Sequence, residues 1–149
     1  MSVAVGYVLT LAIGAAVLSG VVIGVGGVVD SQTDRAVHGE LAVVGETTVA
    51  NLESADRLAR AAAVDRPDDA APSNVSIAVD LPSQVAGRPY RIAVTNETVT
   101  LRTDDPDVRV AIPHAANVTE GSRSVRGGPL RIAYEGDAVD DPALEVTER

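Results

Sequence analysis

Residues 3–29 read VAVGYVLTLAIGAAVLSGVVIGVGGVV, a run of 27 residues without one charged side chain. A helix of about 20 predominantly apolar residues crosses a bilayer, so this run is long enough to span with some tilt. A cleaved secretory signal has a basic segment before a shorter apolar run, and Met1-Ser2 carries no basic side chain. We therefore predict that residues 1–29 form a retained, single-pass transmembrane helix surrounded by membrane lipid.

Small residues recur every four positions along this run, at Ala12, Ala16, Gly20 and Gly24. This spacing places them on one face of a helix, where small side chains let neighbouring membrane helices approach closely. The pattern predicts a helix-packing surface, which we call the small-residue ridge. The alternative is that glycine is simply common in membrane helices.

The remaining composition excludes several classes of function. All 33 charged side chains, 12 basic and 21 acidic, lie in residues 30–149, and the net charge is −9. Cysteine is absent, which excludes disulfides and thiolate sites, and the acidic balance without Trp or Phe argues against nucleic-acid binding. Every basic residue is Arg, and this acidic, lysine-free composition resembles that of proteins from salt-loving archaea, whose carboxylates stay hydrated in concentrated salt.

No catalytic or metal site is predicted. The acidic runs at residues 104–107 and 140–141 lack the ordered spacing and turn glycine of a calcium loop. His38 and His114 accompany no G-x-S-x-G nucleophile motif, and no glycine-rich phosphate loop is present. We expect a non-enzymatic protein without cofactor or small-molecule substrate.

After residue 29 the apolar pattern changes to an amphipathic helix over residues 30–63. Its stripe is made of small residues with a mean spacing near the helical 3.6: Val37, Leu41, Val44, Thr48, Leu52, Ala55, Ala59 and Ala62. Asp56 and Arg60 form a favoured i,i+4 pair, as do Glu53 and Arg57. A capping box beginning at Ser31 would allow a break at residues 30–34; without a break the helix would run from about residue 3 to 63.

Residues 64–73 contain two prolines and read as a linker, and residues 74–149 then alternate with period two. We predict six antiparallel strands in this β domain, at residues 75–79, 90–94, 99–101, 108–112, 130–134 and 144–146, with Asn96-Glu97 as a hairpin turn. The core of such a sheet is thin, so helix 36–63 or a neighbouring subunit is needed to cover it. The predicted fold class is α+β.

Three Asn-x-Ser/Thr sequons follow the membrane segment, at Asn74, Asn96 and Asn117. Each falls at a predicted strand edge or loop, as glycosylation acceptors do. They favour a glycosylated domain outside the cell, although any one of them could be accidental.

The opening VAVGYVLTLAI of residues 3–13 is similar to the start of haloarchaeal type IV pilin-like proteins. The order of a long N-terminal helix and a small β domain also resembles that family, in particular its minor pilins and pseudopilins. The resemblance implies leader cleavage by a prepilin peptidase and packing of the helix against other pilin-like subunits in a filament.

Three interpretations therefore remain open. The first is a structural subunit of a type IV pilus-like or pseudopilus-like surface assembly. The second is a single-pass, membrane-anchored cell-surface binding or adhesion module that does not polymerise. The third, a membrane-bound enzyme, has no site signal in the sequence.

Overall fold

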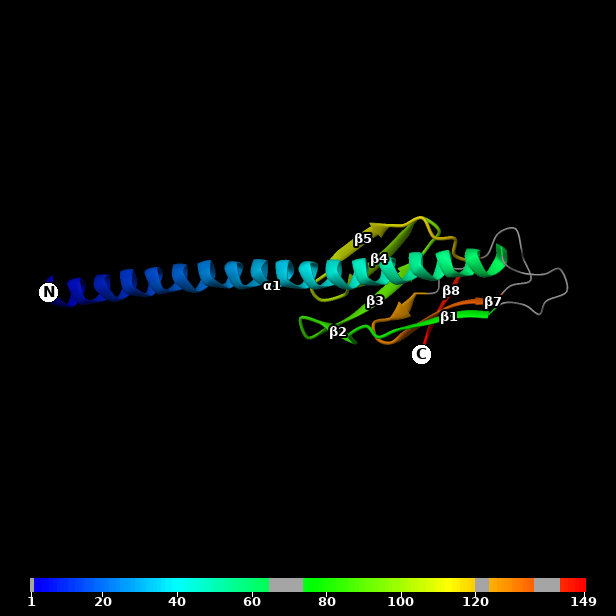
Figure 1. Cartoon of the computed structure of the whole chain (residues 1–149). Coiled ribbons are helices and arrows are strands. Elements are labelled where there is room, and N and C mark those ends of the chain that lie inside the picture. The colour runs from blue at the N-terminus through cyan, green and yellow to red at the C-terminus, as the bar shows by residue number, and fades with distance from the viewer. Residues whose placement is uncertain (1, 65–73, 120–123, 136–142) are drawn as a thin grey trace. The chain divides into compact units, whose positions relative to one another are not determined.

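The computed structural model describes residues 2–64, 74–119, 124–135 and 143–149 (Figure 1). The chain divides into two compact units, residues 1–35 and 36–149. Helix α1 (Ser2–Val64) contributes to both units and continues through residues 30–34, so the break allowed by the capping box at Ser31 does not occur. The predicted fold class, α+β, is confirmed.

The described residues of the second unit form eight strands in two antiparallel sheets. The three-stranded sheet has the order β1-β7-β8, and the five-stranded sheet has the order β2-β3-β4-β5 with β6 also paired to β3. The strands are β1 (Asn74–Val79), β2 (Gln84–Val85), β3 (Arg88–Val94), β4 (Thr98–Thr103), β5 (Arg109–Pro113), β6 (Val125–Arg126), β7 (Leu130–Glu135) and β8 (Glu145–Glu148). All six predicted strands are present, and the turn at residues 96–97 joins β3 to β4 as expected.

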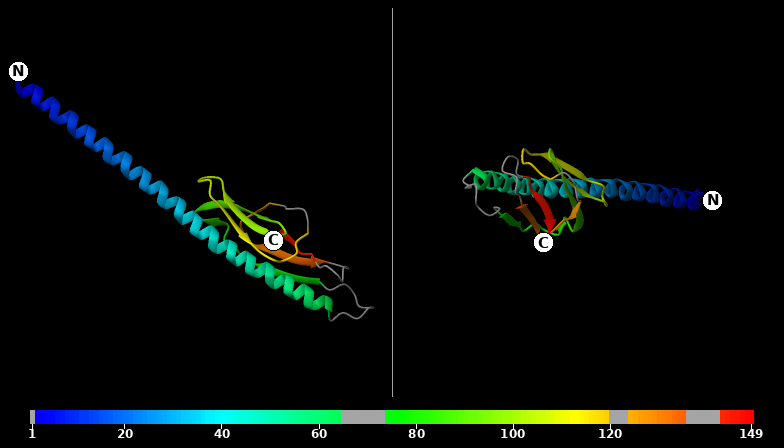
Figure 2. Two further views of the ribbon diagram at one scale, coloured as in Figure 1. Left: turned by 90° about the horizontal axis from the view of Figure 1, so that it is seen from above. Right: turned by 90° about the vertical axis from the view of Figure 1, so that its right-hand side faces the viewer.

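One hydrophobic core joins the second half of α1 to both sheets. Figure 2 shows the strands gathered along one side of this part of the helix. Seven of the eight predicted stripe residues are buried on the helix, and Ala62 is half-buried. The sheets contribute the alternate residues that the period-two pattern predicted, including Tyr90, Ile92, Leu101 and Ile132. The helix therefore supplies the cover that so light a sheet requires.

A glycine allows the helix to approach the five-stranded sheet closely. A Cβ atom built on Gly45 would lie 2.6 Å from Cδ1 of Ile112 and 2.9 Å from Cδ1 of Leu101. Carbon atoms in contact normally lie about 3.5–4.0 Å apart, so a side chain at residue 45 would force the side chains of Ile112 and Leu101 to shift. A second contact forms nearby, where the Ala86 amide donates to the Glu40 carboxylate.

Two short strands were missed by the sequence pattern. β2 and β6 have two residues each, too few for alternation to be visible. The β2–β3 turn also lacks the usual Asn-Gly signal: Ala86 and Gly87 both have positive φ, 45° and 74°. The Glu40 contact holds the Ala86 amide in this turn, and a contact from a distant helix is invisible in local sequence. The predicted linker, residues 64–73, begins one residue too early, because α1 includes Val64; residues 65–73 lie outside the described residues.

Candidate functional site

The first unit presents an uncovered apolar surface. Within α1, residues Ala4–Ile23 have a mean hydropathy of 2.1, and none of this stretch is buried. Large side chains along it are more than half exposed, among them Leu9, Leu18 and Ile23. The segment therefore has the length and composition of a membrane anchor or a signal sequence.

The small-residue ridge lies on this uncovered segment. Ala12, Ala16 and Gly20 are exposed, and a Cβ atom built on Gly20 would meet nothing within 4 Å. Gly24 falls among residues 24–28, whose side-chain surroundings lie outside the described part of the chain. The ridge at Gly20 thus leaves open space at the helix surface, in contrast to Gly45.

The structure brings two of the three sequons together. Asn96 is exposed in the β3–β4 turn, and its Oδ1 accepts a hydrogen bond of 2.8 Å from the amide of Val118, the middle residue of the Asn117 sequon. Asn117 is half-buried, whereas Asn74 is exposed at the first residue of β1. By exposure, Asn74 and Asn96 are better placed than Asn117 to receive a glycan.

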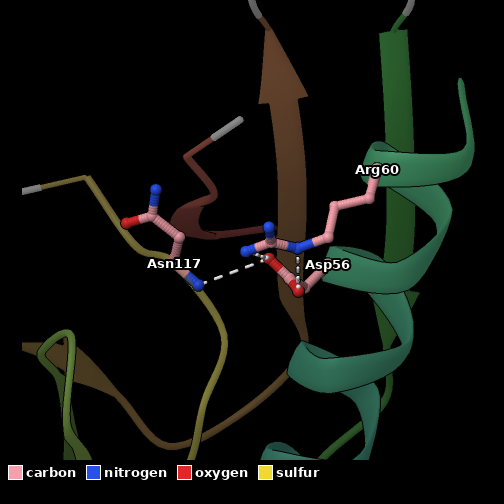
Figure 3. A network of polar contacts seen from close by, with 3 residues as sticks. All are labelled: Asp56, Arg60 and Asn117. Atoms are coloured by element: carbon pink, nitrogen blue, oxygen red, sulfur yellow. Dashed lines mark hydrogen bonds and ion pairs between the residues drawn. The ribbon is translucent and has the colours of Figure 1, made fainter. Parts of the chain in front are cut away.

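Asp56 links the helix to the segment that carries Asn117 (Figure 3). Its carboxylate accepts a 2.8 Å bond from Nε of Arg60, one turn later, and a 3.3 Å bond from the backbone amide of Asn117. The side chain of Asp56 is 12% exposed. The predicted Asp56–Arg60 pair is confirmed, and Arg57 donates to the hydroxyl of Ser54. These two bonds anchor the segment around Asn117 to α1, so the Asp56 carboxylate has a structural role.

The two histidines and the two acidic runs were the other candidates for a site. His38 is exposed on α1, and Nε2 of His114 lies 2.8 Å from the carbonyl oxygen of Thr95. Asp104 pairs with Arg102, and Asp105 pairs with Arg88, whereas residues 140–141 lie outside the described residues. Within the described residues, no group of three or more His, Cys, Asp or Glu side chains is placed to hold a metal ion.

A row of four arginines was not predicted from the sequence. Strand register pairs Arg91 with Arg126 on one side and with Arg102 on the other, and Arg102 with Arg109. Residues directly opposite in an antiparallel pair project from the same face of the sheet, and all four of these side chains are exposed. We call this set, from β6, β3, β4 and β5, the arginine row. Each arginine is isolated in sequence, so only the register reveals the row.

These features define a class of protein: a small α+β protein with a long apolar N-terminal helix, the end of which packs on antiparallel sheets. The chain belongs to the family described as "Family of unknown function (DUF7266)", whose model matches residues 1–144. No curated protein and no solved structure matches the chain.

Proposed function

We propose that the protein is a membrane-anchored, non-enzymatic structural subunit of a type IV pilus-like or pseudopilus-like surface assembly. The observation that carries this proposal is the small-residue ridge on a helix whose apolar surface the chain does not cover. Lipid alone satisfies an apolar helix, and a ridge that admits the backbone of another helix serves association. The similarity of residues 3–13 to pilin-like proteins supports the same interpretation.

Assembly is tested by filling the ridge. Gly20→Leu adds four carbons where a neighbouring helix would approach, and it leaves the segment more apolar, so insertion into the membrane should persist. We expect the variant to lose incorporation into filaments or oligomers, measured by crosslinking and electron microscopy of cells that make the protein. Val21→Leu is the matched control because it adds a methylene on another face. Equal assembly of both variants would contradict the proposal.

The same proposal predicts on which side of the membrane the β domain lies. The β domain faces outward, and Asn74, Asn96 and Asn117 are its candidate glycosylation sites. External protease on intact cells should remove residues beyond about 35, and mass spectrometry of the native protein should find glycan on Asn74 or Asn96. Full protection from protease would place the domain inside the cell.

The single-anchor binding module remains the second candidate, and the arginine row is compatible with it as well as with assembly. An exposed row of cations on a folded domain is a surface for an anionic partner, whether or not the helix polymerises. Under this alternative, Gly20→Leu and Val21→Leu would leave function equally intact, whereas substitutions in the row would abolish binding.

A further inference from the structure

The arginine row sets four like charges side by side on one face of the sheet. Like charges directly opposite one another on neighbouring strands destabilise a sheet. Neighbouring strands lie about 4.8 Å apart, so four positive side chains are set over about 14 Å. In the described part of the chain, Arg102 is the one member with an ion pair, to Asp104 at 2.7 Å. The hydrogen bond and the charge of Asp104 raise the pKa of Arg102.

The surface around the row is hollowed. A cavity of about 440 Å³ is lined by Arg91, Arg102, Arg109 and the Asp104 that pairs with Arg102, with Ala93, Thr100 and Ser124 beside them. Ala93 and Thr100 are paired in register in the next row of the sheet, and their small side chains leave space between the long arginines. A second hollow, of about 280 Å³, adjoins Arg91 and Arg126. Guanidinium groups at the edge of such hollows present paired donors to a carboxylate.

The rest of the sequence is strongly acidic. Taking the four cations of the row from the net charge of −9 leaves −13 on the rest of the chain. A basic face on an otherwise acidic protein is complementary to the other surfaces of the same protein. A contact between two different faces of identical copies is heterologous, and it forms open helical filaments when its rotation does not close.

One acidic surface of the second unit matches the row in spacing. Glu46 is exposed and Glu53 half-exposed on α1, seven residues apart. Two helical turns separate them by about 10 Å along one face. This interval equals two strand spacings, which is the separation of Arg91 from Arg109 across the sheet.

We infer that the arginine row is the docking surface for a second copy of this chain, which binds through Glu46 and Glu53 of its helix. This inference rests on the proposed function, because it names the contact that joins neighbouring β domains in the assembly. Concentrated salt screens long-range attraction, and direct guanidinium–carboxylate contact keeps the pairing specific at short range.

Charge reversal tests the contact in the full-length protein in its own membranes. Arg91→Glu with Arg109→Glu should reduce crosslinked oligomers by at least about tenfold, because like charges placed against each other in an interface cost several kcal/mol. The matched control is Arg131→Glu with Arg149→Glu, which changes the net charge equally at β7 and at the residue after β8, away from the row, and should assemble normally. Adding Glu46→Arg and Glu53→Arg to the first variant should restore assembly. Circular dichroism of each variant verifies folding.

Three outcomes would overturn the inference. The first is normal assembly of the Arg91/Arg109 variant while Gly20→Leu fails to assemble, which leaves the proposed function intact. The second is loss of assembly that the two helix substitutions do not restore. The third is wild-type protein that stays monomeric and binds dextran sulfate through Arg91 and Arg109, which removes the proposed function as well and assigns the row to an anionic polysaccharide.

Discussion

The two halves of α1 use apolar side chains in opposite ways. In the first unit, Val21 is 58% exposed and no side chain of residues 4–23 is buried. In the second unit, Leu41 and Leu52 are fully buried against the sheets. The apolar stripe from Val37 to Ala59 is buried within the chain, whereas the apolar surface of residues 4–23 is uncovered and suits lipid or other helices. One continuous helix thus contributes to the core of a folded domain in its second half and presents an uncovered apolar surface in its first half.

The surroundings of two glycines show the same difference between the two halves of α1. Gly45 lies in contact range of two strand side chains, and Gly20 faces open space. In the second unit glycine is needed for packing inside the chain. In the first unit the structure gives no intramolecular reason for it, and packing between chains is the reason we propose.

The largest expected effect comes from separating the two units. Deleting residues 1–29 should move the protein entirely from the membrane fraction to the soluble fraction in high salt, because every charged side chain is retained and the helix that covers the sheets remains. Fractionation with immunoblotting measures this. If the full-length protein stays soluble without detergent, residues 1–29 are not a membrane segment, and the difference between the two units is not one of environment.

The second test compares glycines within the folded unit, in the soluble fragment 30–149. Gly45→Leu should lower the free energy of unfolding by about 1–3 kcal/mol or more, because the side chain overpacks against Ile112 and Leu101. Gly39→Leu is the control: a Cβ there meets nothing within 4 Å, and leucine favours the helix by up to about 1 kcal/mol. Denaturant unfolding of both variants gives the difference. A Gly45→Leu fragment as stable as the control would show that the close approach is not required.

A smaller effect is expected at the Asp56 contact. Asp56→Ala removes the acceptor of the Asn117 amide bond and the partner of Arg60, and should cost about 1 kcal/mol of unfolding free energy. Glu46→Ala removes the same charge from an exposed position and should change stability by less than about 0.5 kcal/mol. Equal effects would mean that the helix is held by apolar packing alone.

Near neutral pH, ionisation of Tyr90 has the smallest effect, because it changes stability only under alkaline conditions. Burial raises the pKa of Tyr90 from 10.0 to about 12, and its hydroxyl donates to the Pro82 carbonyl at 2.6 Å. Below pH 10 both states of the protein keep the phenol proton; between pH 10 and 12 only the unfolded state loses it, so stability falls as the pH rises through that interval. Melting temperatures of fragment 30–149 and of its Tyr90→Phe variant measure this contribution. A wild-type curve parallel to that of Tyr90→Phe would contradict it.

Local pattern predicted most of the architecture. The run before Asp30 is recognised by its length and its lack of charge. The stripe from Val37 to Ala59 and the alternation around Ile92 and Ile132 are periodic, and the period of apolar residues reports local backbone geometry. The small-residue ridge and the three sequons could also be identified from the sequence, because each is a short local pattern. Their use in assembly and glycosylation stays a prediction.

By itself, then, the sequence determined an apolar helix, an amphipathic continuation and a set of short antiparallel strands. Only the tertiary structure decided which strands pair and in which register, and so placed Arg91, Arg102 and Arg109 side by side. It also decided that Glu40 holds the Ala86 turn and that Asn96 meets the amide of Val118. The physical reason is range: periodicity depends on neighbours within a few residues, whereas register and side-chain contacts depend on how distant segments share one core and satisfy their hydrogen bonds.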